Sequence, residues 1–150
     1  MAFSSFDVTL DGMPAEVTNA MNASAERVDQ LSSAAVAYSG SVTTTDATVT
    51  TVLSFTPPDE GTTLVEASII GVKSDGSASA AYKVFATVGR DGGTTSLIGA
   101  ATQAHVGESA AGYNATIDVS DPSVRIRVTG VAATTFKWYA HVVATTKLAA

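Results

Sequence analysis

The sequence predicts a mainly β protein: an antiparallel β-sandwich or jelly roll of about eight strands, preceded by a short N-terminal helix. Three observations support this. From Thr44 almost to the end, short runs rich in Val, Ile, Thr and aromatic residues alternate between apolar and polar positions. Gly, Pro, Asp and Ser separate these runs at regular intervals, and no helical period follows Gly40. A β-barrel is the alternative that such periodicity leaves open.

Residues 1–40 are predicted to form a separate docking and oligomerisation segment. A short strand is expected over 4–10, and Pro14 suits the first turn of a helix. The positions that follow are spaced by alternating steps of four and three, which is the heptad spacing of a coiled coil: Val17, Met21, Ser24, Val28, Leu31 and Ala35. Two interpretations stay open, a helix lying on its own domain or one that meets symmetry mates. In the second, the oligomer interface contains Val17, Met21, Val28 and Leu31.

Residues 41–150 are predicted to form the β domain, with its boundary near Gly40. The segment 35–45 is small and polar and is expected to be a connector that already contains some strand. The strands expected after it, in chain order, are 47–55, 63–73, 82–90, 94–100, 102–106, 113–119, 124–128 and 135–145.

The hairpin at 82–100 is the most direct local signal in this domain. Asp91-Gly92-Gly93 joins two strand-forming runs, and both glycines can adopt the positive φ that a tight turn requires. Alternation along the first strand places Tyr82, Val84, Ala86 and Val88 on one face and leaves Phe85 on the other.

The same alternation predicts the inward faces of the other strands. In 47–55 it groups Val49, Leu53 and Phe55, and in 63–73 it groups Val65, Ala67 and Ile69. The remaining inward residues are expected to be Tyr113, Ala115, Ile117, Val119, Val124, Ile126, Val128, Phe136, Trp138, Ala140 and Val142. Folding the chain about Asp121-Pro122 places Arg125 opposite Asp118 and Arg127 opposite Thr116.

Composition excludes several classes of function. A net charge of −6, with eight scattered basic residues, argues against nucleic acid as a partner. The absence of cysteine excludes disulfides and thiolate metal sites. No apolar run approaches the roughly 20 residues of a membrane span, and the N-terminus lacks the features of a signal peptide. We therefore expect synthesis in a cytoplasm, no export by the general secretory route and no membrane partner.

No catalytic motif is present, so the sequence predicts a protein that is not an enzyme and needs no cofactor. His105 and His141 are the only histidines, and neither is accompanied by residues at metal-ligand spacing. The carboxylates lie mostly in turns, and their spacing selects no acid–base pair. The sequence contains neither a nucleophile elbow nor a phosphate-binding loop.

Two aromatic residues, Phe85 and Tyr139, fall on the faces predicted to be outward. Only 15% of the chain is charged, so exposed aromatics favour a subunit interface over a ligand site. We predict that Phe85 and Tyr139 contribute to an oligomer interface.

Residues 44–146 resemble a small β-domain that recurs in virion proteins of tailed bacteriophages and related gene-transfer particles. The resemblance is carried by short matches in the same order: Thr-Thr-Asp-Ala-Thr at 44–48, Leu-Val-Glu-Ala at 64–67, Ser-Asp-Gly at 74–76, Ala-Tyr-Lys at 81–83, Arg-Asp-Gly-Gly-Thr-Thr at 90–95, Val-Arg-Ile-Arg-Val-Thr-Gly at 124–130 and Phe-Lys-Trp at 136–138. None of these matches is catalytic.

The resemblance implies a structural protein of the virion, commonly a trimer. A capsid decoration or cement protein, or a head fibre, suits the length of the chain best, with the major capsid protein as its partner. The alternative is a tail-fibre or receptor-binding module that recognises host surface glycan. Exposed aromatics and carboxylates gathered on one loop edge would favour that alternative.

Overall fold

The computed structural model describes residues 33–150, and a compact unit begins at Ala34. Nine strands occur in these residues: β1 (Ser33–Thr44), β2 (Val49–Phe55), β3 (Gly61–Lys73), β4 (Ser79–Asp91), β5 (Thr94–Leu97), β6 (Thr102–Glu108), β7 (Asn114–Ser120), β8 (Ser123–Thr129) and β9 (Phe136–Leu148). The described residues contain no helix that is long and apolar enough to cross a membrane.

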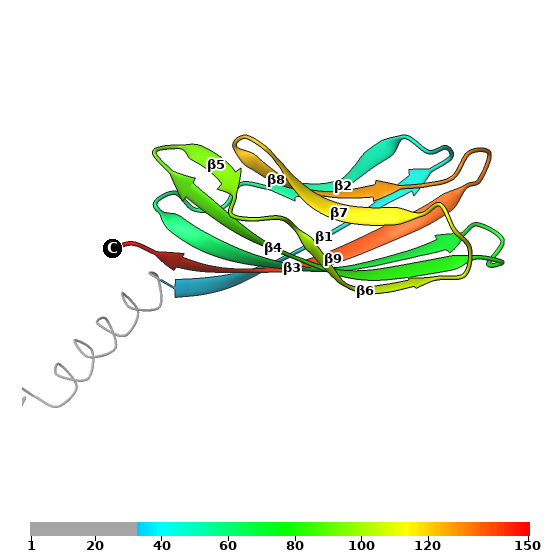
Figure 1. Ribbon diagram of the computed structural model, residues 1–150, viewed down its shortest axis with the longest axis horizontal. Coiled ribbons are helices and arrows are strands. Elements are labelled where there is room, and N and C mark those ends of the chain that lie inside the picture. The colour runs from blue at the N-terminus through cyan, green and yellow to red at the C-terminus, as the bar shows by residue number, and fades with distance from the viewer. Residues whose placement is uncertain (1–32) are drawn as a thin grey trace, which may run out of the picture. The chain divides into compact units, whose positions relative to one another are not determined.

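The strands form two sheets that lie one over the other (Figure 1). The large sheet has the order β1-β9-β3-β4-β5, with β6 also paired to β4. The small sheet has the order β2-β8-β7. All pairings among β2 to β9 are antiparallel, so the prediction of a mainly β, antiparallel fold is confirmed.

Three long strands, β9, β3 and β4, form the centre of the large sheet, and each contains 13 residues. β3 is paired along almost its whole length on both sides, from Gly61 to Val72 with β4 and to Lys73 with β9. The other edge of β4 is shared, since β5 pairs with its last residues and β6 with its first. This arrangement leaves little of β4 unpaired.

The core lies between the two sheets and consists largely of the inward residues that alternation predicts. Val65, Ala67 and Ile69 of β3 are fully buried, as are Val124, Ile126 and Val128 of β8. Trp138 is the largest buried side chain, and its Nε1 donates a hydrogen bond to Thr44 Oγ1 at 3.0 Å. Its ring lies near those of three other aromatic residues: Tyr82, Tyr113 and Phe136.

The start of the described chain differs from the prediction. Ala35, placed at the end of the helical seam, and Gly40, placed at the domain boundary, both lie inside β1. Val36, Tyr38 and Val42 do fall at alternating positions of β1, but the small residues and serines between them weaken this strand signal. The strand predicted over 4–10 and the helix over 17–32 lie outside the described residues.

The inward face predicted for β2 is right only in part, since Phe55 is buried and Leu53 packs against the core. Val49 is exposed and Val52 is buried, although alternation grouped Val49 with Phe55. The pairing of β2 with β8 shifts register between Thr51 and Leu53, and such a bulge reverses the faces of the residues on either side.

The predicted pairing of β7 with β8 is confirmed. Asp118 lies opposite Arg125, and Thr116 lies opposite Arg127. Arg125 donates two hydrogen bonds to the Asp118 carboxylate, each at 2.8 Å, which raises the pKa of Arg125. Arg127 also reaches Asp118, at 3.5 Å.

Tyr82 provides a test of the packing at the edge of the core. Its hydroxyl donates to the Glu108 carboxylate, and burial together with that carboxylate raises the pKa of Tyr82. The folded protein therefore holds this proton more tightly than the unfolded chain, in which tyrosine titrates near pH 10. The stability that results is present below about pH 10 and is lost as the pH rises above it.

We expect the free energy of unfolding to fall above about pH 10 more steeply in the wild-type protein than in Tyr82→Phe. Urea unfolding measured at several pH values on either side of this point tests the expectation. Tyr38→Phe, at a tyrosine whose ring stacks on Phe55, is the control and should keep the wild-type slope. Equal slopes for the wild type and Tyr82→Phe would contradict the claim that folding raises the pKa of Tyr82.

Candidate functional site

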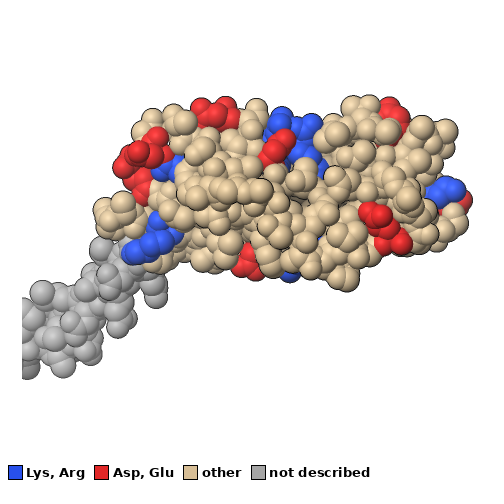
Figure 2. All heavy atoms as spheres, viewed as in Figure 1, with Lys and Arg blue, Asp and Glu red and all other residues tan. Residues whose placement is uncertain are grey.

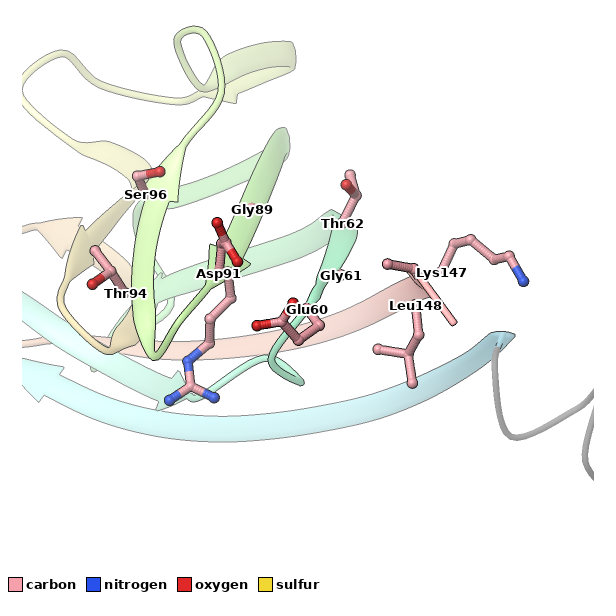
Figure 3. Close-up of a pocket in the computed structure, with 11 residues that line it drawn as sticks. Glu60, Gly61, Thr62, Gly89, Asp91, Thr94, Ser96, Lys147 and Leu148 are labelled. Atoms are coloured by element: carbon pink, nitrogen blue, oxygen red, sulfur yellow. The ribbon is translucent and has the colours of Figure 1, made fainter.

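An open hollow of about 520 Å³, lined by both polar and apolar groups, lies at one end of the large sheet (Figure 3). We call it the end hollow. It lies where β3 begins and where β4 and β9 end, and it is lined by Glu60, Gly61, Thr62, Gly89, Arg90, Asp91, Thr94, Ser96, Lys147, Leu148 and Ala149. Its size is within the range of about 300–1,000 Å³ that is typical of small-ligand sites.

Strand register builds the floor of the end hollow. Thr62 lies between Lys147 of β9 and Gly89 of β4, and Gly89 in turn lies opposite Ser96 of β5. These four residues form one row across the sheet, so their side chains point to the same face. Gly89 has no side chain, and Ile98 packs over it, with its Cδ1 3.0 Å from where a Cβ of residue 89 would lie.

The rim of the end hollow is a loop and a hairpin that hold each other. Glu60 Oε2 accepts a hydrogen bond from the Gly92 amide at 3.2 Å, and Asp59 Oδ1 accepts one from the Gly93 amide at 3.1 Å. Glu60 has a φ of 58°, a conformation that is uncommon for residues other than glycine. The backbone strain at Glu60 is thus offset by contacts that fix its carboxylate at the rim.

The same hairpin is also attached to the small sheet. The Thr95 amide donates to Asp121 Oδ1 at 2.7 Å, and the Thr95 hydroxyl donates to the Pro122 carbonyl at 2.9 Å. Because Asp121 and Pro122 belong to the β7–β8 turn, the hairpin is held from two directions. A rigid rim of this kind positions polar groups with little loss of entropy when a ligand binds.

The polar groups that line the end hollow are hydroxyls, carboxylates and cations. Figure 3 shows the Glu60 and Asp91 carboxylates between Thr94 and Ser96 on one side and Leu148 on the other. Within the described residues, the Asp91 carboxylate has no hydrogen-bond or ion-pair partner. An exposed acceptor beside several hydroxyls is suited to a ligand rich in hydroxyl groups. No group of three His, Asp or Glu side chains in residues 33–150 is placed to hold a metal ion.

A second feature is the face of the large sheet that points away from the core, here called the outer face. Apolar side chains are exposed on its two central strands: Leu64 (44%), Ile70 (57%) and Val72 (40%) of β3, and Tyr139 (46%) of β9. Register places Ile70 opposite Tyr139. The end hollow lies at the end of this same face, beyond Leu64.

Charged side chains are sparse over most of the surface seen in Figure 2, and acidic ones gather at the end where β3 begins. That end carries Asp59, Glu60 and Asp91. Cations lie beside the acidic side chains at this end, and further acidic side chains are scattered over the rest of the surface in view (Figure 2).

The structure places two of the predicted interface residues on the outer face, on strands either side of β3. Tyr139 is exposed, and Phe85 is partly buried opposite Glu66. His105 and His141 are exposed and do not belong to a metal-ligand group of the described residues. Val17, Met21, Val28 and Leu31 lie outside the described residues. The interface role of all six residues stays a prediction.

The end hollow was missed from the sequence. Its loop and its hairpin were both recognised as turns, but they are separated by about 30 residues. Only the pairing of β3 with β4 brings Glu60 next to Gly92. The paired acidic turns, Asp59-Glu60-Gly61 and Asp91-Gly92-Gly93, are the one signal that pointed toward it.

No family model matches the chain, and no curated protein matches it. Among solved structures, the chain is similar to the tailspike protein of Acinetobacter baumannii phage AM24, with a TM-score of 0.45 and 12% identity over 75% of this chain. It is also similar to a tailspike protein of Acinetobacter baumannii bacteriophage Fri1, described as a capsular polysaccharide depolymerase, with a TM-score of 0.43 and 17% identity over 83% of this chain. The chain spans 26% and 21% of the lengths of these two proteins.

Proposed function

We propose that residues 33–150 form a β-sandwich module of a tailed-bacteriophage virion protein, of the tail-fibre or tailspike class, and that the module binds host surface carbohydrate in the end hollow. In this proposal the chain binds the sugar without cleaving it. The observation that carries the proposal is the end hollow itself, a preformed site of about 520 Å³ with hydroxyls, carboxylates and cations around one floor.

The chemistry of the lining supports a saccharide as ligand. Thr62, Thr94 and Ser96 can each donate and accept a hydrogen bond, as sugar hydroxyls do. The Asp91 carboxylate can accept from sugar hydroxyls, and hydrogen bonds to an ionised group are the stronger kind. Arg90 and Lys147 add donors and balance the two carboxylates of the lining, so acidic sugars are not repelled. A glycan-binding module was expected to carry both carboxylates and exposed aromatic residues on one loop edge. The end hollow has the carboxylates, but no aromatic residue lines it.

The role of Glu60 supports binding over hydrolysis. Cleavage of a glycosidic bond requires two carboxyl groups that flank the bond and are free to transfer protons or attack. The Glu60 carboxylate already accepts the Gly92 amide and holds the rim together. Asp91 is left as the one carboxylate of the lining that no other described group engages.

A second candidate, a capsid decoration or head-fibre protein that contacts the major capsid protein, is supported by the outer face. Exposed Leu64, Ile70 and Tyr139 are suited to contact with protein. This candidate assigns no role to the end hollow, so a test of carbohydrate binding separates the two proposals.

We expect the full chain to bind one or more members of an array of purified bacterial capsular polysaccharides and their oligosaccharides. Titration calorimetry with the best oligosaccharide should then show at least about tenfold weaker binding by Asp91→Asn, since about 1.4 kcal/mol corresponds to a factor of ten. Asp75→Asn is the matched control, because it removes the same charge from an exposed turn at the opposite end of β3 and β4, and it should bind like the wild type.

Two results would contradict the proposal. One is an array on which the chain binds no saccharide, and the other is equal affinity for the wild type and Asp91→Asn. The absence of cleavage is tested in the same samples, since the oligosaccharide should keep its length and release no new reducing ends during prolonged incubation. Shortened products would show that the chain is a hydrolase or lyase.

A further inference from the structure

The two solvent-facing sheet surfaces of the described unit differ sharply in chemistry. An antiparallel sheet that packs one face on the core normally presents a polar second face. The small sheet follows this rule over most of its surface, since its outward residues include Asp118, Arg125 and Ser54, and among the described residues its one large exposed apolar residue is Val49 at the start of β2. The large sheet does not follow it, because Leu64, Ile70 and Tyr139 are exposed on its outer face. Formation of the sheet alone does not require exposed apolar residues on the outer face, so another role must explain them.

A groove on the outer face runs beside these apolar residues. It has a volume of about 620 Å³ and lies along β9, between β1 and β3. Ile70 and Val72 form one wall, Ser41 to Thr43 of β1 form the other, and Tyr139 stands beside it. The outer face therefore has both a raised apolar ridge and a recess. A partner surface of complementary shape could pack closely against the two.

Few charges interrupt this region, and those present have both signs. In the paired rows from Leu64 to Val72, the charged residues of β9, β3 and β4 are Glu66, Lys83 and Lys137, and Lys137 also lines the groove. Lys83 Nζ donates to Ser68 Oγ at 3.0 Å, so its charge is partly satisfied within the sheet. Because both signs occur on the face, Glu66 of one copy can pair with Lys83 or Lys137 of another, and such complementary charges favour a second copy as the partner.

The area of the outer face also fits a second copy of the chain. From Leu64 to Val72 a strand is roughly 30 Å long, and the five strands β1, β9, β3, β4 and β6 span roughly 24 Å. The product is roughly 700 Å² for each copy, close to the 800 Å² or so that each partner buries in an interface of standard size.

We infer that the outer face between Leu64 and Val72 is a self-association surface, through which copies of this chain pack with Ile70 and Tyr139 at the centre of the contact. The end hollow lies beyond this area and stays open in the assembly. Several hollows on one particle would then bind a repetitive polymer together, which increases avidity without any new contact. The inference does not depend on the carbohydrate proposal, because association and sugar binding are measured separately.

The test is the mass of the full chain in solution, by light scattering after size exclusion at about 50 µM, a concentration well above a micromolar dissociation constant. We expect a defined oligomer for the wild type and a monomer for Ile70→Glu/Tyr139→Glu, whose new charges would face each other across the contact. Ser54→Glu adds a charge to the exposed surface of the small sheet and should keep the wild-type mass.

A wild-type monomer at this concentration would overturn the inference, and so would an undiminished oligomer in the double variant, which would place association elsewhere in the chain. Circular dichroism checks that the double variant is folded. If the double variant is unfolded, Ile70→Thr replaces it, because threonine is also β-branched. Ile70→Thr should weaken association at least about fivefold. Unchanged association of this variant would overturn the inference. Loss of sugar binding with retained mass would leave this inference standing and contradict only the proposed function.

Discussion

Replacing Trp138 with alanine is expected to destabilise the protein by about 3–5 kcal/mol, as large aromatic truncations in cores do. Trp138 is 2% exposed, and its ring centroid lies 4.8 Å from that of Phe136 and 6.2 Å from that of Tyr113. Its Nε1 hydrogen bond to Thr44 also fixes the end of β1. Removing the indole would leave a cavity at the point where both sheets and β1 meet.

Urea unfolding followed by circular dichroism measures this loss. Lys137→Ala is the matched control, because Lys137 precedes Trp138 on β9 and is exposed on the other face, and it should change stability by no more than about 0.5 kcal/mol. A loss below about 1 kcal/mol for Trp138→Ala would show that this residue is not at the centre of the core.

The second large effect is expected at Gly71, where no side chain can fit. A Cβ at this position would lie 2.3 Å from Phe136 Cε2 and 2.7 Å from Trp138 Cε3. Both rings are buried and cannot move aside freely, so Gly71→Ala should force the aromatic cluster apart. Overpacking of this kind costs about 1–3 kcal/mol and occasionally more.

Gly107→Ala is the control for Gly71→Ala. Gly107 is also in a strand, but a Cβ there would lie 3.4 Å from the nearest atom, His105 Nε2, at the end of an exposed side chain. We expect a change within about 0.5 kcal/mol for Gly107→Ala in the same unfolding experiment. Equal losses in the two variants would mean that the crowding at Gly71 is relieved by rearrangement of Phe136 and Trp138.

Local alternation was sufficient to predict most of the core. The inward residues of the segments that became β3, β4, β8 and β9 were all assigned to the correct face, including Trp138. Alternation is reliable there because each strand is paired without interruption for most of its length. The same local reasoning paired Arg125 with Asp118, because a short turn leaves only one register for the hairpin.

The errors occur where local patterns carry little information. In β1, small residues and serines separate Val36, Tyr38 and Val42, so the alternation typical of a strand is present but weak. In β2 a bulge between Thr51 and Leu53 reversed the faces, and a bulge leaves no regular trace in the pattern of hydrophobicity.

The candidate sites also divide into a part that local alternation predicts and a part that depends on strand order. Phe85 and Tyr139 were expected to face outward because alternation alone decides their side of the sheet, and the structure places both on the outer face. The end hollow depends on contacts among the starts and ends of four strands that are far apart in the chain. Such a site follows from strand order, which local sequence reasoning does not provide.

The most direct test of the account is the position of this protein on the virus particle. Antibodies raised against the full chain can be bound to intact phage particles that contain it and located by electron microscopy. We predict that the label is found on the tail, where a carbohydrate-binding module of a fibre or tailspike would meet the host surface. Label confined to the capsid, or absent from intact particles, would contradict it.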